Sequence, residues 1–264
     1  MRTPTRPSTD YVWPHLSSLP AFRAIIRSIE HRIVSDYVPL RAPVLDLGAG
    51  DGHFTAAVLP GAEIGIDLNP ISLREARRRA AHRLLVCASA TEIPLRSGTI
   101  NAAVANCVVE HIPDLETTLS ELNRVLAPGG TLLLTVPTDR QNPNLLLPTV
   151  LSALRLDAIG GRYMSWFRRV QVHHHMYSRK KWIATVEAAG FSVVRHRGYM
   201  SARATRFFEM GHYFGIHNLL ARKLLGRWVV WPWRPRFYLI ERLLASFVDE
   251  PEHEDDSCLF MEAR

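Results

Sequence analysis

Short apolar runs alternate with amphipathic stretches along the first half of the chain. Runs made mainly of valine, leucine, isoleucine and alanine lie at 44–47, 62–67, 84–89, 101–109 and 131–138. Between them, apolar residues recur every three or four positions, as on one face of a helix. Apolar runs without regular polar alternation are typical of strands covered on both faces. The pattern therefore predicts an α/β fold in which helices cover both faces of a parallel sheet.

The second half of the chain follows a different pattern. Residues 139–177 are irregular and rich in arginine, aromatic residues and histidine. A helix is predicted over 178–190, a strand over 191–199, further helices over 203–248 and a last strand over 257–263.

Three glycines, Gly48, Gly50 and Gly52, follow the first apolar run in the stretch VLDLGAGDGHFT. Glycine inside a helix or strand costs about 0.5–1 kcal/mol relative to alanine, so the cluster indicates a backbone that bends or is closely approached. In open parallel sheets, ligands bind beyond the carboxyl ends of the strands. The spacing departs from the dinucleotide fingerprint, because His53 stands at its third glycine position. Asp67 ends the second run, where a carboxylate can accept both hydroxyls of a ribose.

Five motifs in order resemble the class I S-adenosylmethionine-dependent methyltransferases, in particular the methyltransferase type 11 group. They are VLDLGAGDG (44–52), IGIDLNP (64–70), ASATEIPL (88–95), VVEHIPD (108–114) and ELNRVLAPGGTLLLTVP (121–137). The resemblance implies a Rossmann-like seven-stranded sheet, mostly parallel with an antiparallel last strand. The helical stripes of apolar residues at 217–248 predict a helical lid before that strand. The expected division is an N-terminal arm (1–20), a methyltransferase core (21–198 plus 257–264) and substrate-side insertions (139–177 and 199–256).

The same resemblance implies S-adenosylmethionine as cofactor and assigns its contacts. The methionine portion is assigned to Asp46, to the backbone of Gly48, Ala49, Gly50 and Gly52, and to Asn106; the ribose to Asp67; and the adenine to Leu68, Ser89 and Ala90. Ser89 stands where the family usually has an aspartate that binds the adenine amino group. Its hydroxyl can still accept one hydrogen bond.

Histidines supply the candidate catalytic groups. His111 follows the fourth apolar run at the carboxyl edge of the sheet, so its imidazole is a candidate general base. Alternatively, the Glu-His pair at this point anchors the loop. His173 and His175, with Tyr177, would face one side of an extended segment, as acceptor contacts or proton carriers or as loop packing. No third partner for a metal is identifiable from the sequence, so no metal is expected.

Net charge and the C-terminal composition bear on the acceptor. The net charge of +7 permits anionic partners but selects none of them. The arginine run at 74–83 falls on the outer face of a predicted helix, so nucleic acid is a disfavoured partner. Residues 217–248 combine leucine stripes, three tryptophans and arginines, which is typical of a packed lid or of an interfacial belt. We therefore expect a small, apolar or lipid-linked acceptor, with peripheral membrane contact through 217–248 as an option.

Three widely separated cysteines and an N-terminus without an apolar signal segment are typical of a cytoplasmic protein. Peripheral contact would then be with the inner membrane surface. Two other functions stay open: a catalytically silent binding module with this fold, supported by Ser89, and an RNA methyltransferase, supported by the charge alone. A nicotinamide-dependent oxidoreductase is disfavoured by His53.

Overall fold

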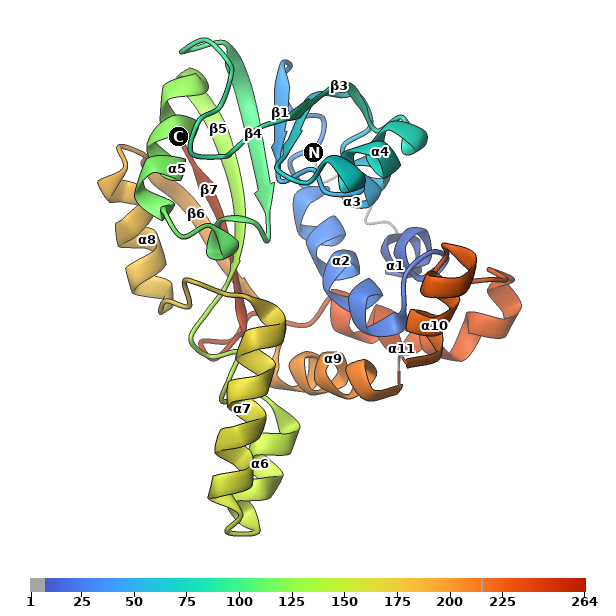
Figure 1. The fold of residues 1–264 in the computed structure, drawn as a ribbon. Coiled ribbons are helices and arrows are strands. Elements are labelled where there is room, and N and C mark those ends of the chain that lie inside the picture. The colour runs from blue at the N-terminus through green and yellow to red at the C-terminus, as the bar shows by residue number, and fades with distance from the viewer. Residues whose placement is uncertain (1–7, 215) are drawn as a thin grey trace.

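Seven strands form one sheet in the order β3-β2-β1-β4-β5-β7-β6 (Figure 1). The computed structural model describes residues 8–214 and 216–264. The strands are β1 (Val44–Leu47), β2 (Ala62–Asp67), β3 (His82–Cys87), β4 (Ile100–Asn106), β5 (Leu126–Pro137), β6 (Val193–Tyr199) and β7 (Cys258–Ala263). β7 runs antiparallel to both of its neighbours, whereas the other neighbouring pairs are parallel. The predicted fold class, a Rossmann-like sheet with an antiparallel last strand, is confirmed.

Helices cover both faces of this sheet. They are α1 (Thr9–Leu16), α2 (Ala21–Val34), α3 (His53–Val58), α4 (Pro70–Arg79), α5 (Leu115–Val125), α6 (Leu146–Ala153), α7 (Asp157–Gln171), α8 (Arg179–Ala188), α9 (Ala202–Phe214), α10 (Ile216–Leu225) and α11 (Tyr238–Val248). Alternate strand residues point to opposite faces. Ala102 packs with the cluster formed by α1, α2 and α11, and Ala103 packs with the cluster formed by α5 and α8.

Local sequence explains where the helices beside the glycine loop begin. The side chain of Asn69 accepts hydrogen bonds from the N–H groups of Ile71 and Ser72, with Pro70 in the first turn of α4. Asp114 caps α5 in the same way by accepting from Thr117 N–H. Asn69 therefore starts α4 two residues after the end of β2, whereas Asp114 starts α5 only after the short 3-10 turn Val109–His111 that follows β4.

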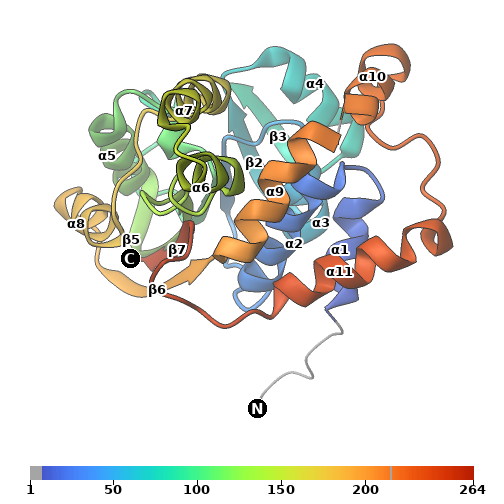
Figure 2. The same ribbon diagram turned by 90° about the horizontal axis from the view of Figure 1, so that it is seen from below.

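Helices α6, α7, α9, α10 and α11 gather beyond the carboxyl ends of the parallel strands (Figures 1 and 2). Residues 139–177 contain α6 and α7, so the expectation of irregular chain there is wrong. α6 has no fully buried side chain, and α7 contains Gly160 and Gly161, which weaken a helical pattern. The helical lid before the last strand is present as predicted.

The expected N-terminal arm is wrong for the residues that the structure describes. Tyr11, Val12 and Leu16 of α1 are buried against α2 and α11. Pro14 lies inside α1 and obscures its helical pattern in the sequence. Residues 1–7 of the predicted arm lie outside the described residues.

No helix within residues 8–214 and 216–264 is both long enough and apolar enough to cross a membrane.

Candidate active site

The glycine loop after β1 has a backbone that side chains would not tolerate. Gly48, Gly50 and Gly52 have φ angles of +72°, +54° and +71°. A Cβ atom on Gly48 would lie 2.3 Å from Cγ2 of Val108, and one on Gly52 would lie 3.0 Å from Cα of Ala76. The left-handed turns and the close approach of neighbouring chain explain why glycine occupies these positions.

Asp67 at the end of β2 is hydrogen-bonded to the backbone of this loop. Its Oδ2 accepts a hydrogen bond from Gly50 N–H at 2.8 Å, and its Oδ1 accepts from Asn69 N–H at 2.7 Å. Each carboxylate oxygen has a further lone pair for another donor. The side chain is therefore oriented by the backbone and still available to hydroxyl groups.

A cavity of about 550 Å³ opens beside Asp67, between the ends of β2 and β3. We name it the β2–β3 cavity; its lining includes Gly48, Asp67, Leu68, Ser89, Ala90, Cys107 and His111. Leu68 is 72 % exposed, so it offers an apolar surface without packing in the core. The hydroxyl of Ser89 pairs with that of Thr91 at 2.7 Å and fixes the turn. The residues assigned to ribose and adenine thus come together.

A second cavity, of about 370 Å³, lies on the other side of the loop. We name it the β1 cavity; its lining includes Arg23, Arg27, Asp46, Gly48, Ala49, Gly50 and Asn106. The Asp46 carboxylate accepts from the Thr55 hydroxyl and lies 2.8 Å from Nε2 of His82. These contacts fix the orientation of the buried Asp46 carboxylate. Gly52 does not line either cavity; its role is to let α4 approach.

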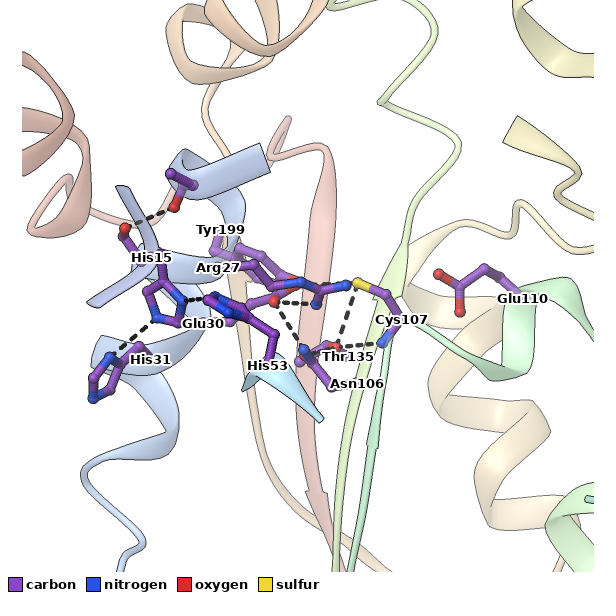
Figure 3. A network of polar contacts seen from close by, with 12 residues as sticks. His15, Arg27, Glu30, His31, His53, Asn106, Cys107, Glu110, Thr135 and Tyr199 are labelled. Atoms are coloured by element: carbon purple, nitrogen blue, oxygen red, sulfur yellow. Dashed lines mark hydrogen bonds and ion pairs between the residues drawn. The ribbon is translucent and has the colours of Figure 1, made fainter. Parts of the chain in front are cut away.

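A buried carboxylate organises the edge of the β1 cavity, and the sequence analysis missed it (Figure 3). Glu30 of α2 is fully buried and accepts hydrogen bonds from Arg27 at 2.6 Å and from the Tyr199 hydroxyl at 2.9 Å. It also accepts from Nδ2 of Asn106 at 3.0 Å and from the Cys107 thiol at 3.1 Å. The sequence signal was a glutamate within an apolar helical stripe, three residues after an arginine.

The charges of this network follow from burial and pairing. Burial, reinforced by nearby Glu30, raises the pKa values of the Tyr199 hydroxyl and the Cys107 thiol, so both groups remain hydrogen-bond donors. Burial alone would lower the pKa of Arg27, but Glu30 raises it overall. Arg27 and Glu30 therefore form a charged pair whose carboxylate fixes the amide of Asn106 at the end of β4.

A third cavity, of about 220 Å³, follows β4. We name it the β4 cavity; its lining includes Phe22, Arg23, Arg27, Cys107, Glu110, His111, Gln141, His173 and His212. Cys107 and His111 line both this cavity and the β2–β3 cavity. Cys107 has a φ of +54°, a conformation that non-glycine residues seldom adopt and that is common at functional sites.

The β4 cavity brings together two of the predicted catalytic histidines and one unexpected carboxyl group. Glu110 is 1 % exposed, and burial raises its pKa to about 8. Burial, with the nearby His111, lowers the pKa of His173 to about 4. His111 Nδ1 donates to the carbonyl of Val172 at 3.1 Å, and its ring lies 5.0 Å from that of His173.

His175 and Tyr177 do not line the β4 cavity, contrary to their assignment as catalytic candidates. Nε2 of His175 donates to the carbonyl of Ile112 at 2.9 Å, and Nδ1 pairs with the Tyr177 hydroxyl at 3.0 Å. The Tyr177 ring packs on Trp182. The side chain of His175 is thus bonded to the backbone that follows β4, a packing contact within the loop.

Comparison with known proteins agrees with this geometry. A family model described as "Methyltransferase domain" matches residues 45–134. The chain is 37% identical over 123 residues to trans-aconitate 2-methyltransferase of Methylobacterium radiotolerans, covering 44% of this chain and 46% of the relative. It is 32% identical over 166 residues to the ubiquinone/menaquinone biosynthesis C-methyltransferase UbiE of Syntrophotalea carbinolica, covering 58% and 70%. The chain spans less than half the length of the first curated relatives that it matches.

A solved S-adenosylmethionine-dependent methyltransferase from Mesorhizobium loti shares the fold. Its TM-score is 0.55 at 17% sequence identity, and the match covers 89% of this chain and 97% of that one.

A left-handed glycine loop lies between two cavities, with a carboxylate on the neighbouring strand, and this is the arrangement that Rossmann-like folds use to bind nucleotide ligands. The chain belongs to the class I S-adenosylmethionine-dependent methyltransferases. The residues present fit the cofactor: Asp67 keeps lone pairs for ribose hydroxyls, and the bare loop lets a ligand approach the backbone. The predicted family and cofactor are confirmed.

Proposed function

We propose that this protein transfers a methyl group from S-adenosylmethionine to a small acceptor that is apolar or lipid-linked. The supporting observation is a cavity of about 900 Å³ under the lid helices, here named the lid cavity. Its lining is mainly apolar and includes Leu16, Leu19, Phe22, Phe207, Met210, Ala221, Trp228, Val230, Trp231, Phe237 and Ile240. Pockets of this kind bind ligands through apolar contact and a few oriented polar groups.

The lid cavity and the cavities beside the glycine loop and β4 share lining residues and are therefore adjacent. Phe22 lines both the lid cavity and the β4 cavity, and Leu19 and Trp228 line both the lid cavity and the β1 cavity. An acceptor with its apolar part under the lid would therefore present its polar end near Cys107 and Glu110. The names of the relatives, which refer to trans-aconitate and to quinone biosynthesis, also support a small acceptor.

Methyl transfer requires the protein mainly to position S-adenosylmethionine and the acceptor. The cofactor supplies a methyl group that is already activated on a positively charged sulfur; the acceptor's electron pair takes the methyl as the sulfur takes the C–S pair. Holding reactants in line contributes about 7–11 kcal/mol of barrier reduction. In this proposal the polar lining of the β4 cavity, which includes Glu110, His111 and His173, orients the reacting group of the acceptor, and the lid excludes water.

Fractionated extract of the source cells tests the proposal without a guess at the acceptor. Purified protein and methyl-labelled S-adenosylmethionine are incubated with lipid, small-molecule, RNA and protein fractions. We expect label in the lipid or small-molecule fraction, and none with the Asp67→Ala variant. Label in RNA would instead establish the RNA methyltransferase, and cofactor binding without label in any fraction would establish the silent binding module.

A further inference from the structure

Buried polar atoms without a hydrogen-bond partner concentrate at the β4 cavity. Among the described residues, such side-chain atoms are His82 Nδ1, Glu110 Oε2, Gln141 Oε1 and His173 Nδ1. Glu110, Gln141 and His173 all line the β4 cavity. An unsatisfied buried polar group costs about 1–3 kcal/mol, so three on one cavity indicate a ligand that completes them. Figure 3 shows the Glu110 carboxylate beyond Cys107, apart from the Glu30 network.

Three side chains at the β4 cavity place potential metal-ligand atoms close together. Glu110, His111 and His173 each offer one ligand atom, and these atoms lie within 4.8 Å of one another. Because His111 Nδ1 donates to the Val172 carbonyl, its Nε2 carries the free lone pair. That nitrogen is 3.8 Å from Oε1 of Glu110, too far for a hydrogen bond. A ring nitrogen fixed by a backbone carbonyl is the usual outer-shell arrangement of a metal-binding histidine.

The backbone holds the two segments together without any ligand. The N–H groups of His174 and His175 both donate to the carbonyl of Glu110, at 2.8 and 3.2 Å. Nearby cations have other partners: Arg27 pairs with Glu30, and the Arg23 guanidinium lies over the Trp228 ring at 5.5 Å. The cavity therefore offers one carboxyl group and two imidazoles, while Arg27 and Arg23 are engaged with Glu30 and Trp228.

We propose that Glu110, His111 and His173 bind one divalent transition-metal ion of the zinc or iron(II) class. Two nitrogen donors and one carboxylate suit these ions, whereas magnesium and calcium prefer all-oxygen sites. No metal was expected from the sequence because no third partner for His173 and His175 was identifiable; the fold instead places His173 beside Glu110 and His111, about sixty residues earlier in the chain. Resting on the proposed function, the ion would act as a Lewis acid toward an oxygen of the acceptor at the cavity beside the cofactor.

Metal binding to the purified, chelator-treated full chain tests this directly. Zn²⁺ is titrated by calorimetry, and Co²⁺ is titrated as a spectroscopic probe by visible absorption. We expect one ion per chain, and affinity reduced at least about 100-fold by Glu110→Gln and by His173→Ala. His174→Ala is the matched control, because this adjacent histidine has an exposed side chain, and the variant should bind as the wild type does.

Three outcomes would overturn the proposal: no stoichiometric Co²⁺ spectrum in the wild type, unchanged affinity in His173→Ala, or an equal loss in His174→Ala. Thermal unfolding of each variant shows that it is folded, and Glu110→Gln keeps the shape of the side chain. Binding of S-adenosylhomocysteine is measured on the same samples. If that nucleoside binds and label still reaches an acceptor fraction while no metal binds, the metal inference fails and the proposed methyl transfer stands.

Discussion

A single carboxylate at the end of β2 links the shape of the glycine loop to its expected ligand. Asp67 accepts N–H groups from Gly50 and Asn69, so its orientation is set before any ligand arrives. A preset acceptor loses little conformational freedom on binding, which increases the affinity that each hydrogen bond provides.

Replacing Asp67 by alanine should weaken binding of S-adenosylhomocysteine by about 10- to 100-fold, since hydrogen bonds to a charged group contribute about 1.5–3 kcal/mol. Isothermal titration calorimetry measures the change, and Asp36→Ala is the control, because Asp36 pairs with Arg32 on the exposed side of α2. An unchanged dissociation constant for Asp67→Ala would mean that the ribose is bound elsewhere.

Two ion pairs, one within α2 and one between α2 and the residue that follows its C-cap, allow burial to be tested at nearly constant distance. Arg27 and Glu30 are 2.6 Å apart with the carboxylate fully buried, whereas Arg32 and Asp36 are 2.7 Å apart and Asp36 is exposed. Removing Arg27 leaves the buried carboxylate of Glu30 without its charged partner. Arg27→Leu should therefore lower the free energy of unfolding by about 3 kcal/mol. Arg32→Leu should cost less than about 1 kcal/mol. Urea denaturation measures both; equal losses would show that Glu30 is not held as a charged partner.

At the scale of elements, the core strands and the glycine loop were predictable from the sequence. Continuous apolar runs mark the strands, and the clustered glycines mark a turn with left-handed backbone. α1 and α6 were not predictable, because Pro14 and the absence of a fully buried stripe hide their period. Glu110 was missed as a functional residue because its importance comes from burial and from His173, which only the tertiary fold provides.

Substitutions on α10 test whether the lid cavity binds apolar molecules. Ala221 of α10 lines the lid cavity, whereas Leu224 on the same helix is 78 % exposed. Ala221→Trp should fill the cavity and reduce binding of an apolar fluorescent probe by about tenfold or more, because the apolar surface that the probe would bury is already covered. Leu224→Trp should leave probe binding unchanged, and both variants should keep their affinity for S-adenosylhomocysteine. Equal probe binding in the two variants would place the apolar site outside the lid.

For the whole molecule, buried histidines link stability to pH. Nδ1 of His15 lies 2.9 Å from Nε2 of His53, and burial lowers the pKa of His15 well below its usual value and that of His53 to about 4. The unfolded chain binds protons on these groups near pH 6.5, whereas the folded chain does not. Their stabilisation is therefore complete above about pH 6.5 and is lost as the pH falls toward 4.

Denaturation between pH 7 and 5 should show this loss, at up to about 1.4 kcal/mol per pH unit for each histidine. Glu110 acts in the opposite direction, because its raised pKa favours the folded state as the pH falls below about 8. His53→Gln isolates the histidine contribution: the variant should show a shallower fall in the free energy of unfolding. An equally steep fall would assign the acid sensitivity to other groups.

The outer surface of the lid carries the last prediction, which concerns how an apolar acceptor reaches the site. Leu220 and Leu224 of α10 and the tryptophans at 231 and 233 are all more than half exposed, and Trp231 also lines the lid cavity. Apolar side chains beside arginines on a chain of net charge +7 favour an anionic lipid surface. The protein should float with anionic vesicles at low salt, less so at 0.5 M salt because ions screen the attraction, and much less with Trp231→Ser and Trp233→Ser combined. Failure to float at low salt would mean that the acceptor arrives through water, and Trp231 would then serve only as part of the wall of the lid cavity.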